Sequence, residues 1–328
     1  MLNIGQFEIS RVIESEGPFL PVQDFIPDSD PAVVEANADW LYPRYIEPGT
    51  DKIMLTIQSY ILRTPRHTIL VDTCVGNNKP RPGRPMFDQL NLPYLADLAA
   101  AGVQAEEVDF VLCTHLHVDH VGWNTKLIDG RWVPTFPNAK YIFARTEYEF
   151  WEQRHLDGTE GPVPNVYDDS VLPVMEAGQA VLVDMDHQID DGMWFEPAPG
   201  HTAGNVVLNL QSEGDRAVMC GDVMHHPLQL VRPEWSSRAC EDAAMSTATR
   251  RAFIERHADT GTLIAPAHFT SPTMGHIIRR GDAFGYELIA DDVGSSAGTE
   301  AWLGLFWTAL PCYGLKRNLR FDTARNHW

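Results

Sequence analysis

The chain has 328 residues, of which 44% are hydrophobic and 21% are charged, and its formal net charge is −20. This composition supplies enough apolar material for a globular core and for one large domain or two ordinary ones. So acidic a chain is a poor match for nucleic acid or an anionic membrane surface, because each of these partners needs a basic face.

The N-terminal stretch MLNIGQFEISRVIESEG has no basic start followed by an apolar run of signal-peptide length. No apolar run in the sequence approaches the roughly 18–20 residues needed to cross a bilayer. We therefore expect a cytoplasmic protein with no membrane partner. The five cysteines are widely spaced and form no CxxC pair, so we expect them to be free thiols, mostly buried.

Three regions follow one another along the chain. Pro, Asp and aromatic residues are frequent in positions 17–50, and we expect residues 1–50 to form an irregular N-terminal arm. Residues 51–282 are assigned to one main domain. Residues 283–328 form a C-terminal extension, whose apolar stretch AWLGLFWTALPCYGL is too short to span a membrane. We expect this extension to pack on the domain or to make an oligomer contact, with a homodimer as one option.

Short runs in the main domain have the lengths and residue types of β-strands and are bounded by Gly, Pro, Asp or Asn. In chain order they lie within residues 53–64, 67–76, 108–115, 140–146, 193–202, 205–212, 217–223 and 262–269. Apolar spacing and end signals predict helices within 87–102, 145–156 and 241–261, the second with a Thr146–Glu149 capping box. Residues 157–180 are expected to be a loop insertion. Strands interleaved with helices indicate an α/β fold in which helices cover the sheets.

Residues that can bind metals follow several of these strands directly. In layered α/β proteins ligand sites lie at the carboxyl ends of the strands, so these side chains are expected to meet at one edge. A single histidine after a strand is usually a hydrogen-bonded loop residue, but chance is a poor explanation for the whole set. The set comprises His115, His117, Asp119, His120, His201, Asp222, His268 and, after an earlier strand, Asp72.

The chemistry of these residue types favours metal binding. Imidazole nitrogens and carboxylate oxygens are ligands of catalytic zinc, which keeps one position open for water. Two metals about 3.5–4 Å apart can share a hydroxide and hold a reacting group from both sides. We therefore predict two divalent metal ions, with zinc expected first, although manganese, cobalt or iron can use the same ligands.

The chain resembles metallo-β-lactamase-fold hydrolases in four segments, which occur in the order THLHVDH, PGHTAGN, GDV and PAHF. The resemblance covers roughly residues 50–280 and implies a four-layer αβ/βα sandwich, in which two mixed sheets pack face to face with helices outside. It also implies that Asp72 supports the metal ligands from behind. By this resemblance the first metal is held by His115, His117 and His201, the second by Asp119, His120 and His268, and Asp222 bridges both.

Several branches of this family fit the sequence poorly. Zinc β-lactamases usually carry Cys where this chain has Asp222, and flavin-linked di-iron enzymes carry Glu where it has His117. Ribonuclease members conflict with the net charge of −20. Glyoxalase-II-like thioesterases have a basic, helical C-terminal part that GLKRNLRFDTARNHW does not match convincingly.

Two branches remain, the quorum-quenching lactonases and the organophosphate and aryl-ester hydrolases of the methyl-parathion-hydrolase type. Bacterial lactonases of the first branch carry Tyr three residues after the bridging Asp, whereas this chain has His225 there, as the second branch does. His225 is expected either to donate a hydrogen bond to a developing oxyanion or to pack beside the site. His226 is expected on the surface or in the core.

Aromatic residues near the ligand-bearing segments are candidates for an apolar substrate pocket. For Trp123 a pocket position and a core position have equal support. For Trp235 and Phe269 a core position is favoured.

The resemblance implies a metal-dependent hydrolase that opens lactones or cleaves esters of small organic substrates. In its mechanism a hydroxide held between two metals attacks the substrate, and Asp119 transfers a proton to the leaving group. Alternatives on the same site are hydrolysis of organophosphates or aryl esters, dehalogenation of aryl halides, and an iron-dependent persulfide dioxygenase. A non-catalytic, metal-stabilised scaffold is the last alternative, although structural zinc sites are usually closed by four ligands rather than seven.

Overall fold

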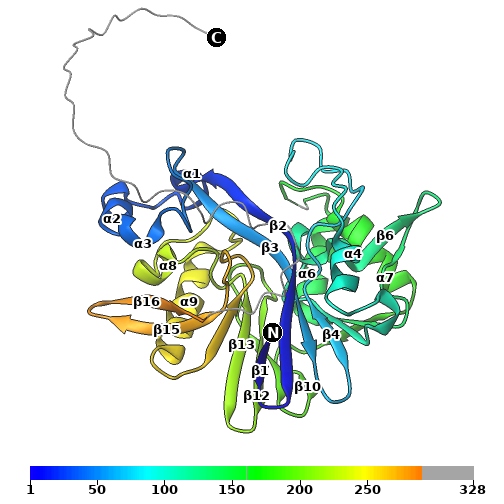
Figure 1. The fold of residues 1–328 in the computed structure, drawn as a ribbon. Helices are drawn as coiled ribbons and strands as arrows, with labels where there is room; N and C mark the ends of the chain where they lie inside the picture. Colours follow the sequence, from blue (N-terminus) through cyan, green and yellow to red (C-terminus); the bar gives the residue numbers. More distant parts are fainter. Residues whose placement is uncertain (160, 290–328) are drawn as a thin grey trace, which may run out of the picture. The chain divides into compact units, whose positions relative to one another are not determined.

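The computed structural model describes residues 1–159 and 161–289. In this part of the chain two seven-stranded sheets and one separate hairpin are formed (Figure 1). The first sheet has the order β1-β2-β3-β4-β5-β8-β9, formed by Leu2–Ile4, Phe7–Pro21, Lys52–Arg63, Thr68–Val71, Phe110–Leu112, Lys140–Ala144 and Ala180–Val183. The second has the order β10 to β16, formed by Gln188–Asp190, Met193–Pro197, Val206–Ser212, Asp215–Gly221, Leu263–Pro266, Gly275–Arg280 and Ala283–Leu288. The hairpin pairs β6, Thr125–Ile128, with β7, Arg131–Pro134.

Helical segments connect these strands. The α-helices are α1 Val22–Phe25, α2 Pro31–Ala36, α3 Ala38–Leu41, α4 Tyr94–Ala100, α5 Val118–Val121, α6 Arg145–Leu156, α7 Leu172–Glu176, α8 Leu228–Val231 and α9 Ala243–His257. The 3₁₀-helices are η1 Ala105–Glu107 and η2 Gly122–Asn124, and η3 Tyr167–Val171 is a π-helical turn.

Three apolar clusters show that the sheets pack face to face with helices outside. The central cluster joins the two sheets, with Ile69 from β4 and Leu208 from β12 among its members. A second cluster packs α4 and α6 on the first sheet, and Leu98 is one of its buried residues. A third packs α9 on the second sheet through Phe253 and Ile254. The layers are those of the predicted αβ/βα sandwich (Figure 1).

The N-terminal region differs from the irregular arm that its composition indicated. Residues 2–21 form β1 and β2, and β2 pairs antiparallel with β3 from Glu8↔Arg63 to Pro21↔Lys52. The register shifts before Pro21, where the strand ends, and α1 begins directly after it. Asp30, another residue that favoured an irregular arm, accepts a hydrogen bond from Ala32 N and caps α2. The hydrophobic residues of 22–46 pack as one cluster with Leu228 and Trp235.

The predicted helices are confirmed, but two local expectations are wrong. Thr146 and Glu149 form no capping box, because α6 begins at Arg145 after Ala144, and no side chain caps it. Residues 157–180 are not a simple loop, since η3 and α7 lie within them. Asp169 of η3 is buried and pairs with two buried cations. Its partners, Lys79 and Arg81, lie far from Asp169 in the sequence, so no periodic pattern around Asp169 indicates these ion pairs.

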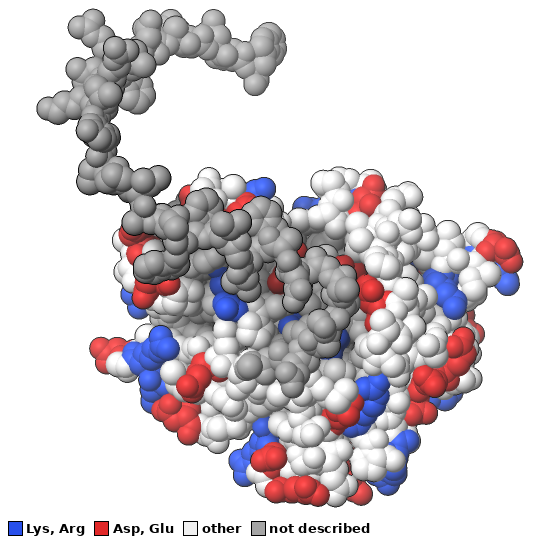
Figure 2. All heavy atoms as spheres, in the orientation of Figure 1, with Lys and Arg blue, Asp and Glu red and all other residues white. Residues whose placement is uncertain are grey.

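The fold continues past residue 282, because β16 pairs antiparallel with β15 from Gly275↔Leu288 to Arg280↔Ala283. The rest of the expected C-terminal extension, residues 290–328, lies outside the described residues, and so does its predicted oligomer contact. None of the described helices is both long and apolar enough to cross a membrane. Figure 2 shows Asp and Glu side chains interspersed with Lys and Arg on the visible face.

Candidate metal centre

The THLHVDH segment places its polar side chains in two directions. β5 ends at Leu112, the chain continues as a loop through His117, and α5 begins at Val118. His115 and His117 therefore precede the helical turn, whereas Asp119 and His120 lie within it. This change from loop to helix separates the two pairs.

Three imidazoles meet at the first group. His201 Nε2 lies 3.1 Å from His115 Nε2 and 2.8 Å from His117 Nδ1. His115 Nε2 and His117 Nδ1 are 3.1 Å apart. His201 follows Gly200, whose φ of 122° requires glycine, and a Cβ there would lie 2.1 Å from Ser246 N. The turn at Gly200 thus brings PGHTAGN to the THLHVDH loop.

Asp119, His120 and His268 form the second group. Asp119 Oδ1 lies 3.9 Å from His120 Nε2, and Asp119 Oδ2 lies 3.7 Å from His268 Nε2. His268 follows the end of β14, at the same edge of the molecule as the end of β5. Its imidazole is held by a 2.9 Å hydrogen bond from Nδ1 to the carbonyl oxygen of Thr56.

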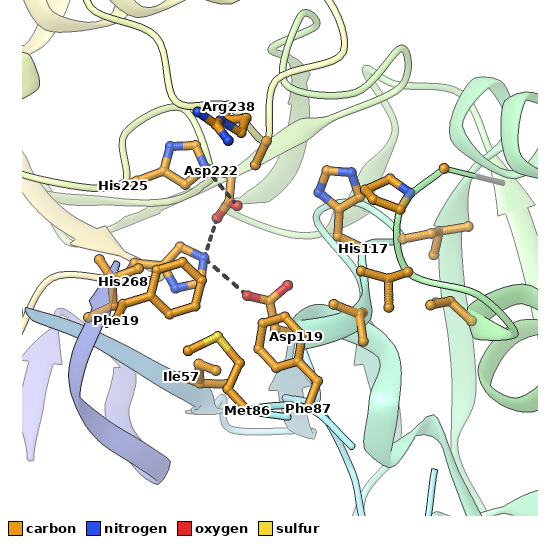
Figure 3. Close-up of a pocket in the computed structure, with 18 of the residues that line it drawn as sticks. Phe19, Ile57, Met86, Phe87, His117, Asp119, Asp222, His225, Arg238 and His268 are labelled. Atoms are coloured by element: carbon orange, nitrogen blue, oxygen red, sulfur yellow. Dashed lines mark ion pairs between the residues drawn. The ribbon is translucent and has the colours of Figure 1, made fainter. Parts of the chain in front are cut away.

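Asp222 lies between the two groups, and each of its carboxylate oxygens faces one of them. Oδ2 is 3.1 Å from His201 Nε2 and 3.7 Å from His115 Nε2. Oδ1 is 3.0 Å from His268 Nε2 and 3.3 Å from His120 Nε2. The close-up in Figure 3 shows the carboxylates of Asp222 and Asp119 both facing His268 Nε2. This is the geometry of a carboxylate that bridges two ligand sets.

The donor set fits divalent metal ions better than a hydrogen-bonded network. Among the described residues His120 Nε2 and Asp222 Oδ1 are buried without a hydrogen-bond partner, which is costly for polar atoms. Four ligand atoms tetrahedrally placed at 2.0–2.1 Å from zinc stand about 3.3 Å from one another, close to the separations in the first group. The candidate ligands fall into two sets, His115, His117, His201 and Asp222, and Asp119, His120 and His268.

Residues 55–282 match the family model described as the metallo-beta-lactamase superfamily. The chain belongs to this superfamily. Its candidate metal centre occupies the edge of the sandwich at which β4, β5, β13 and β14 end.

Curated relatives within the superfamily are named N-acyl homoserine lactonases. The lactonase of Bacillus cereus is 25% identical over 186 residues, which cover 53% of this chain and 65% of the relative. That of a Bacillus species is 24% identical over 185 residues, again covering 53% and 65%. The chain thus spans slightly less than two thirds of the length of these relatives.

Solved structures share the whole sandwich. The hydrolase AbOPH of the beta lactamase superfamily superposes with a TM-score of 0.72 at 23% identity, covering 88% of this chain and 97% of that chain. AidC, a dizinc quorum-quenching lactonase, gives a TM-score of 0.70 at 21% identity, covering 88% and 96%. At these identities the likeness establishes the fold.

Asp72 lies behind the second ligand group, in contact with His120. Its Oδ2 is 2.8 Å from His120 Nδ1, and its Oδ1 accepts a 2.8 Å hydrogen bond from Thr114 N. A proton on His120 Nδ1 leaves Nε2 free to face Asp222. Asp72 has a φ of 59°, a conformation that Asp tolerates better than most residues.

Burial and charge act on the imidazoles in opposite senses. Burial lowers the pKa of His115 and His117 well below the usual histidine value. Burial also disfavours the charged form of His201, but the Asp222 carboxylate and Cys240 together outweigh burial and raise the pKa of His201 to about 10. A cation bound at the first group would displace the proton from His201, because metals bind neutral imidazole.

Glu147 is a buried carboxylate that sequence patterns did not reveal. It accepts hydrogen bonds from Leu116 N at 2.9 Å and from Trp151 Nε1 at 2.7 Å. Its other oxygen accepts from Thr202 Oγ1 at 2.7 Å and Gly204 N at 2.8 Å. Through these hydrogen bonds Glu147 of α6 connects the loop that carries His115 and His117 to the loop that carries His201.

The two neighbouring histidines after Asp222 have different surroundings. His225 lines the cavity described next, and its Nε2 is 3.1 Å from Asp222 Oδ2. Its Nδ1 is buried and has no hydrogen-bond partner among the described residues. His226 belongs to the interior, where its Nε2 lies 2.8 Å from the carbonyl oxygen of Tyr45. Burial lowers the pKa of both imidazoles to about 4.

A cavity of about 660 Å³ opens onto the metal centre, and His117, Asp119, Asp222, His225 and His268 are part of its wall. Most of the remaining wall is apolar and includes Phe25. Figure 3 labels four further apolar residues of the wall, Phe19, Ile57, Met86 and Phe87.

Trp123 does not line this cavity, so the structure favours the core position that the sequence left open. Its ring stacks on Tyr94 with centroids 5.1 Å apart, and its Nε1 donates a 2.7 Å hydrogen bond to Glu14. Trp235 and Phe269 are buried in apolar clusters, as favoured from the sequence.

Proposed function

We propose that this chain is a dinuclear-metal hydrolase that opens lactones or cleaves esters of small organic substrates. The observation that carries the proposal is the position of Asp222, whose two oxygens face two separate ligand groups at the end of an apolar cavity. His115, His117 and His201 would hold one ion, Asp119, His120 and His268 the other, and Asp222 would contact both.

Two divalent ions in these positions would supply Lewis acidity and an acidified water. Asp119 lines the cavity, and its side chain keeps 19% of its exposure. Its carboxylate can therefore accept a proton near the reacting centre and pass it to the leaving group. The apolar wall orients an acyl or aryl group and excludes competing water.

His225 is proposed as a further catalytic residue. A neutral imidazole carries one N–H, and a proton on Nε2 can be donated either to Asp222, 3.1 Å away, or to a substrate oxygen in the cavity that His225 lines. Donation to a developing oxyanion would lower the barrier, whereas donation to Asp222 would position the carboxylate. The two roles differ in whether removal of the imidazole changes turnover or metal content.

The names of the relatives support a lactone as the first substrate class, because the 25%-identical protein of Bacillus cereus is an N-acyl homoserine lactonase. A second candidate is hydrolysis of aryl esters, phosphotriesters or activated aryl halides. His225 favours this candidate, since it stands where the resemblance to homoserine lactonases predicts Tyr. An imidazole is shorter than a phenol and leaves more room beside Asp222.

A hydrolysis panel tests the proposal. The panel contains acyl-homoserine lactones, other lactones, aryl esters, phosphotriesters and activated aryl halides, each assayed with purified, unchelated protein. We expect at least one ester or lactone to be hydrolysed and the activity to be lost in chelator and restored by added metal. Hydrolysis that persists after complete metal removal, or no hydrolysis of any ester or lactone, would contradict the proposal.

A further inference from the structure

Two arginines line the cavity, and they differ in their partners. Arg154 forms an ion pair with Glu241 at 2.5 Å, and its guanidinium lies over the ring of Phe150. The guanidinium of Arg238 has no hydrogen-bond or ion-pair partner among residues 1–159 and 161–289. A cation at the wall of a largely apolar cavity is therefore available to a ligand.

The backbone of Arg238 is held in place by contacts on both sides. Arg238 N donates a 2.8 Å hydrogen bond to the carbonyl oxygen of Phe25. The preceding residue, Ser237, is buried, and its hydroxyl lies 3.4 Å from His225 Nε2. Two residues further on, Cys240 Sγ lies 3.6 Å from His201 Nδ1. The segment 237–240 is thus packed against two histidines of the centre and against the N-terminal region.

Apart from Asp119 and Asp222 of the metal centre, the carboxylates that line the cavity are Glu16 and Glu241, and both have other partners. Glu16 accepts hydrogen bonds from Thr56 Oγ1 at 2.6 Å and from Ser271, and Glu241 is paired with Arg154. In Figure 3 Arg238 is drawn beside His225, while Ile57, Met86 and Phe87 lie on the side of Asp119. A ligand in this cavity meets a positive charge in one part of the wall and apolar groups in another.

We propose that Arg238 is a specificity-determining residue that recognises an anionic group on the substrate. The substrate class is then an ester or lactone that combines an apolar body with an oxyanion, such as a carboxylate, sulfonate or phosphate, distinct from the bond that is cleaved. A planar guanidinium can bind such a group through two parallel hydrogen bonds. This inference rests on the proposed hydrolase function.

The test uses pairs of substrates that differ only in this charge. Phenyl esters of adipic and suberic acid with a free terminal carboxylate are compared with the same esters ending in a carboxamide, and a terminal sulfonate forms a third arm. Release of phenol by the metal-loaded protein is followed. We expect kcat/KM for the anionic ester to exceed that of the amide by about ten-fold or more at one chain length, mainly through KM.

Arg238→Gln should abolish this preference, and Arg238→Lys should retain part of it, because lysine keeps the charge without the planar fork. Arg232→Gln is the matched control, since Arg232 is exposed on the same connection but does not line the cavity. An equal preference in wild type and Arg238→Gln overturns the assignment, because the metals themselves would then select the anion. Loss of the preference in Arg232→Gln also overturns it, because the effect would then not be specific to Arg238.

A binding arm separates failure of this inference from failure of the hydrolase function. Calorimetric titration of the metal-loaded protein with 4-phenylbutyrate and with 4-phenylbutanamide requires no turnover. Tighter binding of the acid that depends on Arg238 supports anion recognition even if no ester is hydrolysed. Equal binding of acid and amide by wild type, together with unselective hydrolysis, overturns the inference while the hydrolase function stands.

Discussion

Asp222 lies between the two ligand groups and faces both of them. Replacement by Ala removes both oxygens, so Asp222→Ala should bind fewer than two metals. Its turnover should fall by more than the roughly 10–100-fold loss that removal of a hydrogen-bond partner of a metal ligand causes. Elemental analysis and turnover on the best panel substrate measure both effects. Asp215→Ala is the control, because Asp215 is exposed at the start of β13, the strand that Asp222 follows. A variant that keeps two metals and normal turnover would show that Asp222 is no bridge.

His225 allows its two proposed roles to be separated. If its imidazole donates to a developing oxyanion, His225→Ala should lower kcat by about 10²–10³ and keep its full metal content. If the imidazole only positions Asp222, metal content should fall instead. His226→Gln is the control, because His226 contacts the carbonyl oxygen of Tyr45 and does not line the cavity. Unchanged steady-state kinetics in His225→Ala would eliminate the catalytic role.

Helix α6 joins the two ligand-bearing loops through Glu147. Glu147→Gln replaces one acceptor oxygen by an NH₂ group, which opposes the donors that now point at the carboxylate. We expect metal affinity, measured by competition with a chelator, to fall about 10–100-fold. Glu149→Gln, exposed on the same helix, should bind metal normally. An unaltered affinity in Glu147→Gln would mean that the loops hold their positions without this contact.

The π-helical turn η3 is fixed by a buried charge cluster. Asp169 accepts hydrogen bonds from Arg81 at 2.6 and 2.8 Å, and Lys79 Nζ lies 3.4 Å from its Oδ1. Asp169→Asn leaves two buried cations without a counter-charge, so the free energy of unfolding should fall by about 3–5 kcal/mol in urea denaturation. The neighbouring, half-exposed Asp168→Asn should change it by less than about 0.5 kcal/mol. Equal effects of the two variants would refute the cluster's role.

At the scale of the whole molecule, local patterns predicted the metal centre because its residues directly follow strands. His115, His201 and His268 each come after a short apolar run, and the ends of such strands meet at one edge of a sandwich. The structure brings the seven predicted ligands together in two neighbouring groups, with Asp222 counted in the group of His115, His117 and His201.

The missed features depend on contacts between distant segments. Trp123 follows the THLHVDH segment by three residues, yet its ring lies in the core. There it stacks on Tyr94 and donates a hydrogen bond to Glu14. Glu147 and Asp169 are buried charges that no periodicity reveals, since their partners lie elsewhere in the chain. Arg238 likewise becomes notable only when the cavity around it is known.

Back-titration of the metal-free protein with zinc tests the central claim, a dinuclear hydrolytic centre, most directly. Seven candidate ligands in two groups joined by Asp222 should bind two ions per chain. Hydrolysis of the best substrate should therefore rise with added zinc and level off at two equivalents, as elemental analysis of the recovered protein should confirm. A plateau of activity and of metal content at one equivalent, or a firm content of one iron per chain in the purified protein, would contradict the account.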